Sequence, residues 1–347
     1  MNNILPVAWS GFSSIYLEPG LLLSVMKASG RYEEWMQTQF INLYASVYQT
    51  GSLIYRDGYL KLFYESTRPE MLHSFFAMQP WPEVHRDSVA DRAASDLSAE
   101  RYVLLDLDEF HIPGTYYAGR VHYWRRFLLY GYDRSQELFY AASHNRFAQL
   151  KPFAIPRTLL EQAADPAQGR EDIANASLQQ GITLCLKQGM LEHIPYHPYV
   201  IYRQLVDYRD TPYTRLCRCT PREQTQDVYG LSLYDLVIDR LKLGLHYLEK
   251  ADYRVLGMLA EQKAGLAGRL ELMKQRYPSF AATGLSEEYQ AMSDRAGELL
   301  RLMLRFGSAD DASRRKAWKE IIDGIRWMQQ RDRQGVDRLI DCLEQLE

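Results

Sequence analysis

Acidic and histidine side chains flank a short turn near the middle of the chain. Asp106 and Asp108 end one apolar run, His111 follows in the turn, and His122 precedes a second apolar run. Two buried strands that meet at this turn would bring the four side chains to one end of a sheet, over a hydrophobic core. An imidazole beside a carboxylate can accept and return protons as a general acid or base. The segment therefore predicts a polar site suited to proton transfer.

The same side chains form an incomplete set of metal ligands. His111, His122 and Asp108 would supply two imidazoles and one carboxylate, a common ligand set for divalent transition metals. A further ligand at a defined spacing is missing, and the histidine pair within residues 193–198 lies among prolines that predict a rigid turn. We therefore expect no metal and no other bound cofactor, and keep a metal-dependent enzyme as an alternative.

Composition excludes several classes of function. The 347 residues include 41 Lys and Arg against 44 Asp and Glu, so no excess of positive charge favours nucleic-acid binding. No apolar run is long enough to cross a membrane, and neither a leader-like start nor a disulfide or zinc spacing of the four cysteines is found. We expect a cytoplasmic, reduced protein. The 25 tyrosines, against 12 phenylalanines, predict amphipathic walls of pockets or interfaces.

Hydrophobic periodicity predicts two domains in an α+β protein. Residues 1–220 mix helix signals with strand-like runs, among them residues 102–107, 126–132 and, less regularly, 196–206. Residues 221–347 carry apolar side chains at helical spacing and predict a helical domain that folds over a cleft or forms a homodimer. Charge runs in these helices, such as Arg331-Asp332-Arg333, predict solvated faces.

A longer pattern surrounds the central turn. Residues 108–113 read Asp-Glu-Phe-His-Ile-Pro, and residues 122–133 read His-Tyr-Trp-Arg-Arg-Phe-Leu-Leu-Tyr-Gly-Tyr-Asp. The block resembles the butirosin biosynthesis acyltransferase family, where the pattern is Asp-Glu-Tyr-Tyr-Ile-Pro followed by His-Phe-x-His-Asp-x-Leu-Ile-Tyr-Gly-Tyr-Asp. The resemblance implies a papain-like domain that acts in natural-product biosynthesis of the nonribosomal peptide type. Its implied reaction moves an acyl or peptidyl group from a carrier-protein thioester to an amine, or hydrolyses that thioester.

The cysteine nucleophile that the resemblance implies is missing. No cysteine precedes Cys185, and Ser14 or Tyr16 occupies the expected start of the first helix. One interpretation makes Ser14 a replacement nucleophile, with His122 as its base and Asp108 as the orienting acid. The alternative is that Ser14 caps the helix that follows.

The second histidine of the family pattern is also replaced, here by Arg125. A guanidinium at this position would hold a carboxylate or the phosphate of a phosphopantetheine arm, and Tyr16, His111 and Tyr132 would complete the substrate-binding wall. The competing hypothesis is a non-catalytic pseudoenzyme whose cleft binds a carrier protein or a peptide intermediate. The sequence leaves open whether the protein is an enzyme.

Overall fold

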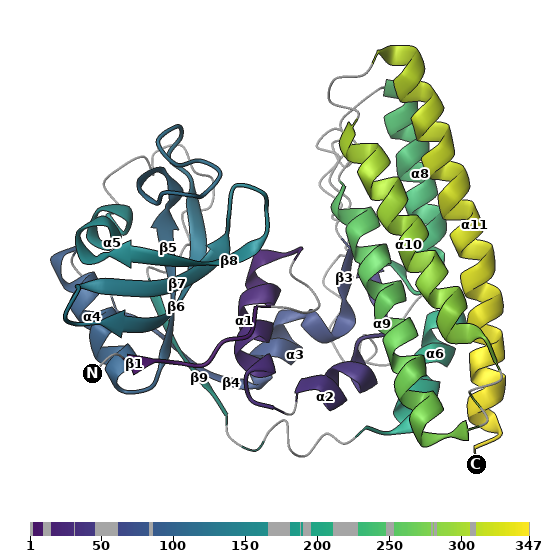
Figure 1. Ribbon diagram of the computed structural model, residues 1–347, viewed down its shortest axis with the longest axis horizontal. Helices are drawn as coiled ribbons and strands as arrows, with labels where there is room; N and C mark the ends of the chain where they lie inside the picture. Colours follow the sequence, from purple (N-terminus) through teal and green to yellow (C-terminus); the bar gives the residue numbers. More distant parts are fainter. Residues whose placement is uncertain are drawn as a thin grey trace. The chain divides into compact units, whose positions relative to one another are not determined.

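The computed structural model of this protein describes most of the chain (Figure 1). The described residues are 3–9, 15–30, 32–45, 62–82, 86–165, 181–187, 189, 196–210, 228–247, 253–278, 280, 283–305 and 310–346. Mixed helix and sheet in the first half, followed by helices in the second, confirm the predicted α+β class. Among the described helices, none is long and apolar enough to cross a membrane.

The chain divides into two compact units, and each unit is formed by two separate stretches of the sequence. The first unit comprises Met1–Glu33 and Pro69–Ile194, and the second comprises Glu34–Arg68 and Pro195–Glu347. The predicted linear division into residues 1–220 and 221–347 differs from this one, because the helical unit also includes residues 34–68 and 195–220. The predicted boundary itself falls within residues 211–227, outside the described residues.

An antiparallel sheet forms the centre of the first unit (Figure 1). Its order is β4-β9-β5-β6-β7-β8, and β1 also pairs with β6. The strands are β1 (Asn3–Ile4), β4 (Phe76–Pro80), β5 (Tyr102–Asp108), β6 (Trp124–Asp133), β7 (Leu138–His144), β8 (Leu150–Pro156) and β9 (Gly181–Leu186). Every residue of β5 is buried, including Asp106 and Asp108, and its apolar run Tyr102–Leu105 is typical of a central strand. The helices of this unit are α1 (Leu17–Lys27), α3 (Pro69–Ser74), α4 (Arg86–Ser98) and α5 (Arg157–Ala163).

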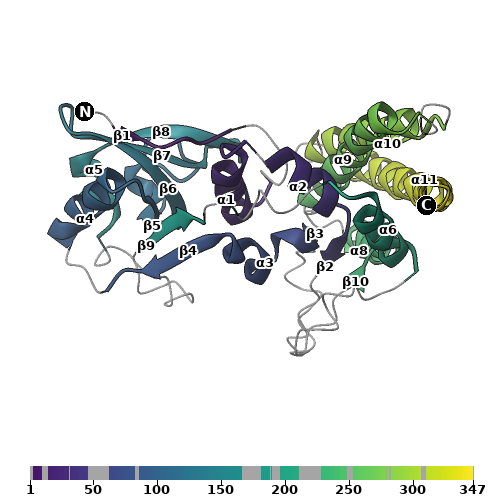
Figure 2. The same ribbon diagram turned by 90° about the horizontal axis from the view of Figure 1, so that it is seen from below.

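Long helices make up most of the second unit (Figure 2). They are α6 (Pro198–Asp210), α8 (Ser232–Tyr247), α9 (Arg254–Arg276), α10 (Leu285–Leu304) and α11 (Asp311–Glu344), while α2 (Tyr32–Gln39) begins in the first unit and continues into the second. A small antiparallel sheet of β2 (Leu43–Ala45), β3 (Leu62–Tyr64) and β10 (Val228–Tyr229) completes it. The strand predicted over residues 196–206 was wrong: most of these residues form α6, which Pro198 begins, and its buried Ile201, Leu205 and Tyr208 recur at helical spacing.

A glycine fixes the path of the chain from β10 into α8. Gly230 has a φ of +58°, and its amide donates to the carbonyl of Leu43. A Cβ at this position would overlap the carbonyl oxygen of Tyr208. Only glycine combines this backbone conformation with such a close approach.

A charged cluster lies inside the helical unit, contrary to one prediction. Lys263 on α9 and Asp332 on α11 are both fully buried and form an ion pair. The hydroxyls of Tyr208 and Tyr234 donate to Oδ2 of Asp332 at 2.6 and 3.0 Å. Asp332 therefore does not belong to a solvated face, although Arg331 and Arg333 on either side of it are exposed. Burial lowers the pKa of Lys263 and raises the pKa of Tyr208 well above its ordinary value.

Candidate functional site

The site is built around Asp108, the last residue of β5. The chain turns there into a short 3-10 helix, Glu109–His111, and Oδ1 of Asp108 accepts the amide of Phe110 at 3.1 Å. The same oxygen accepts the amide of Tyr123 at 2.9 Å, from the segment that leads into β6. With a side chain only 1% exposed, this carboxylate is held in one orientation by the backbone.

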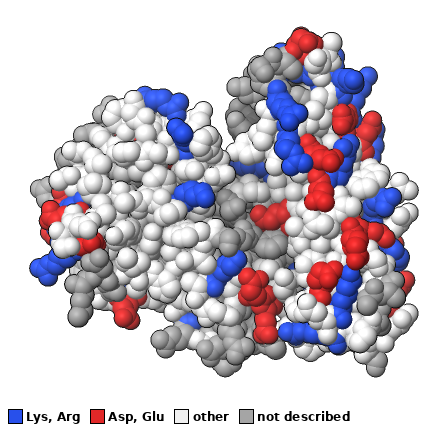
Figure 3. All heavy atoms as spheres, viewed as in Figure 1, with Lys and Arg blue, Asp and Glu red and all other residues white. Residues whose placement is uncertain are grey.

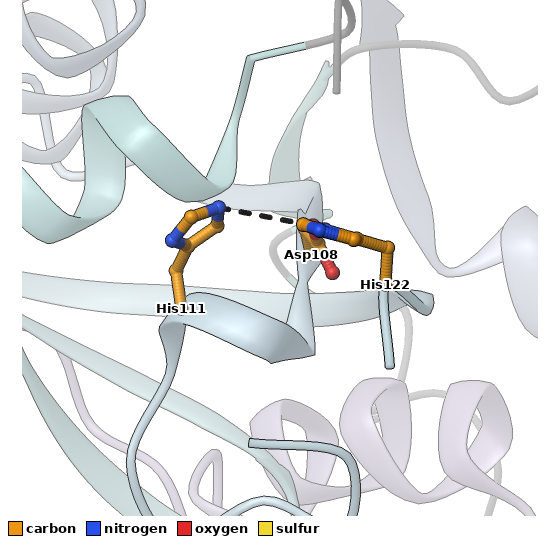
Figure 4. A group of neighbouring side chains, drawn as sticks. All are labelled: Asp108, His111 and His122. Carbon is orange, nitrogen blue, oxygen red and sulfur yellow. Dashed lines mark hydrogen bonds and ion pairs between the residues drawn. The ribbon is translucent and has the colours of Figure 1, made fainter. Parts of the chain in front are cut away.

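His122 lies against the other carboxylate oxygen. Its Nδ1 is 2.5 Å from Oδ2 of Asp108, beside which Figure 4 shows it. Its ring stacks on Phe110 with centroids 4.3 Å apart. An ionised carboxylate can only accept, so Nδ1 carries the hydrogen of this bond, and in the neutral ring Nε2 carries the lone pair. The His122 side chain is 39% exposed, while its acidic partner is buried. A fixed acid thus orients an accessible base.

His111 completes a compact group of three. Its Nε2 is 3.9 Å from Oδ2 of Asp108, and one ligand atom from each of Asp108, His111 and His122 lies within 4.8 Å of the others. The group is small enough to hold a divalent metal ion. However, two ligand atoms on one tetrahedral zinc, each about 2.1 Å from it, are roughly 3.4 Å apart. The separation of 2.5 Å between His122 and Asp108 is that of a hydrogen bond, and the pair would have to open to admit a metal.

Two ion pairs support the site from the neighbouring strand positions. Arg126 sits opposite Asp106 in the β5–β6 register and contacts it at 2.7 Å. Arg125 contacts the fully buried Glu109 at 3.0 Å. Burial raises the pKa of Glu109, although Arg125 and the amide of Tyr117 both act to lower it.

The ion pair with Glu109 gives Arg125 a structural role in place of the predicted role as an anion clamp. Its positive charge is compensated by Glu109 inside the protein, so the residue supports the turn at the end of β5. The sequence did not indicate this pairing, because strand alternation says nothing of where Glu109 points after the strand has ended. The stacking of His122 on Phe110 was missed for the same reason.

The other predicted site residues lie elsewhere or outside the described part of the chain. Tyr132 stacks on Phe139 near the far end of β6, roughly 26 Å along the strand from its start beside His122. Tyr16 is buried immediately before α1, as a core residue is. Ser14 lies outside the described residues. The structure thus brings together Asp108, His111 and His122, and it separates Tyr132 from them.

The chain matches no protein-family model and no curated protein sequence. The resemblance to the butirosin acyltransferase family therefore stays a prediction, and the geometry of the site is the main argument for function.

Proposed function

We propose that this protein transfers an acyl or peptidyl group from a carrier-protein thioester directly to an amine, in the biosynthesis of a nonribosomal peptide-type natural product. The observation that carries the proposal is the fixed, buried Asp108 holding the accessible His122 through Nδ1. The resemblance of the surrounding residues supplies the substrate class, with the phosphopantetheine arm of the carrier as the acyl bearer. His122 acts as general base, and Asp108 is its positioning residue.

A direct transfer needs no cysteine. The neutral amine attacks the thioester carbonyl while Nε2 of His122 removes its proton, and a carbon–nitrogen bond forms. The tetrahedral intermediate then collapses, the carbon–sulfur bond breaks, and the departing thiolate takes the proton from the imidazolium to become the free thiol. Asp108 stabilises the imidazolium between these two steps. Because a thiolate leaves readily, a preceding acyl-enzyme is not required for this chemistry.

The decisive experiment is reconstitution with acyl-loaded carrier proteins and a panel of amines, with the amide product measured by mass spectrometry. We expect His122→Gln to lower turnover by about 10² to 10⁴-fold, the usual contribution of a positioned general base. His73→Gln is a matched control in the same unit, since the His73 side chain is 38% exposed and that of His122 is 39% exposed. This control should retain full turnover.

Intact-protein mass spectrometry separates the direct route from its rivals. With carrier alone, the mass of the protein should not change. A covalent adduct that maps to Ser14 would replace the direct mechanism with a serine acyl-enzyme. Undiminished turnover in His122→Gln would remove His122 from the reaction. A stable carrier complex without any turnover would favour the pseudoenzyme hypothesis.

A further inference from the structure

A cavity lies in the helical unit. A cavity of about 560 Å³ opens where the start of α6 meets the end of α11, two segments that run side by side in both views (Figures 1 and 2). This volume is within the range of small-molecule sites. The residues that line it include His197, Tyr199, Tyr202, Tyr277, Leu343 and Glu344. None of them belongs to the site around Asp108.

Aromatic rings dominate the lining. Tyr199 and Tyr202 are three residues apart on α6, and their rings are nearly parallel with centroids 6.2 Å apart. Tyr277, just after α9, adds a third phenol ring. The face of such a ring carries partial negative charge and attracts cations. Tyr199 is 48% exposed, which is high for a residue with so much apolar area.

One negative charge accompanies these rings. Glu344 lines the cavity, and its Oε1 accepts a hydrogen bond from the Tyr202 hydroxyl at 2.9 Å. Among the described residues that line the cavity, none is a lysine or an arginine. Arg276, which precedes Tyr277 in the sequence, lies over the ring of Tyr196 at 4.4 Å and contacts Glu34 at 3.5 Å. The lining is therefore complementary to a single positive charge. The guanidinium of Arg276 already lies on the ring of Tyr196, which precedes the lining residue His197.

We infer that this cavity binds a small organic ammonium ion, with the ammonium group on the tyrosine faces and its charge compensated by Glu344. Aromatic surface and one carboxylate are the two elements that recognise alkylated ammonium groups. The inference stands independently of the proposed acyl transfer, because it uses different residues in the other unit.

The test compares choline with its neutral isostere 3,3-dimethylbutan-1-ol, by calorimetric titration of the full chain. The two probes have nearly the same shape and differ in charge, so the alcohol reports burial of methyl groups alone. We expect choline to bind at least about tenfold more tightly than the alcohol. Equal affinity of the two probes, or no binding of choline, would overturn the inference.

Two substitutions assign the binding to this cavity. Glu344→Gln keeps an acceptor for Tyr202 and removes the charge, and we expect it to weaken choline about tenfold. Tyr199→Leu removes one ring face from an exposed position and should weaken choline about fivefold. Tyr253→Leu, which changes a tyrosine of the same unit that is 40% exposed, should leave the affinity as it is. Unchanged affinity in both cavity variants, with their helical content intact, would place choline elsewhere and refute the site.

Discussion

Each unit of this protein contains a close acid–base pair, and the two pairs differ in burial. In the first unit, Asp108 is buried while His122 is 39% exposed. In the helical unit, Lys263 and Asp332 are both fully buried beneath three tyrosines, Tyr208, Tyr234 and Tyr289. A pair with one accessible partner can exchange a proton with a substrate. A pair in which both partners are buried can only connect helices, and removing its two charges from water costs free energy on folding.

The two pairs also differ in how many elements of the fold they connect. Lys263 and Asp332 are 69 residues apart in sequence and join α9 to α11. The three tyrosine rings around Lys263 come from α6, α8 and α10. Five helices therefore meet at one charge pair. The Asp108 pair, in contrast, involves one strand end and the segment before the next strand. The first arrangement favours one particular packing of helices, and the second positions a base.

Breaking the buried pair should give the largest effect. Lys263→Met leaves an acid without its cation, and Asp332→Leu leaves an isolated ammonium group. Each change should lower the free energy of unfolding by about 3 to 5 kcal/mol, measured by urea denaturation and far-UV circular dichroism. The double variant should recover most of this loss, because no unpaired charge remains. Single variants as stable as the wild type would show that the pair is not a structural element.

Substitution in the pair of Asp108 and His122 should reduce turnover strongly and stability only slightly. Asn at position 108 can still accept the amides of Phe110 and Tyr123, but its NH₂ group would face Nδ1 of His122 and favour the wrong tautomer. We expect Asp108→Asn to reduce transfer by about 100-fold or more, while the free energy of unfolding falls by no more than about 2 kcal/mol. A variant that loses stability and retains turnover would erase the distinction between the two pairs.

Arg125 gives an intermediate case with a defined pH dependence. Burial raises the pKa of Glu109, so the folded state binds this proton more tightly than the unfolded chain does, and stability falls as pH rises through the folded pKa. Arg125→Met removes a cation that lowers this pKa, which extends the loss to higher pH. We expect little destabilisation near about pH 4 and roughly 1 to 3 kcal/mol near about pH 8. Arg120→Met, at an exposed position in the same segment, should show no such dependence.

An exposed acid on the same helix as Asp332 should give the smallest effect. Asp337 is 51% exposed and contacts Arg209 at 3.5 Å. Charged side chains of both signs are spread over the visible surface of the helical unit (Figure 3). Asp337→Asn should change the free energy of unfolding by less than about 0.5 kcal/mol, because water and salt screen such pairs. A loss comparable to that of Asp332→Leu would mean that burial does not set the importance of these acids.

The predictable parts of the fold are those governed by local periodicity. Runs of apolar residues identified most of β5 and β6, and strands that meet at a turn were enough to expect Asp108 beside His122. The ion pair of Arg125 with Glu109 was not predictable, since it depends on the 3-10 turn after β5. Asp332 was misassigned because two exposed arginines flank it, and only the packing of α9 against α11 reveals its partner.

One oxygen atom of Asp108 has a kinetic consequence for the loop that it spans. Oδ1 accepts amides from Phe110 and Tyr123, on opposite ends of the segment between β5 and β6, and the amide of Glu109 donates to the carbonyl of Tyr123 at 2.9 Å. The carboxylate that orients His122 therefore holds the two ends of this segment together in a closed loop. Local opening of this loop exposes both amides at once, so their hydrogen exchange should be correlated. His122 loses its hydrogen bond to Asp108 in the same event. The lifetime of the closed segment therefore sets how long His122 stays positioned for proton transfer.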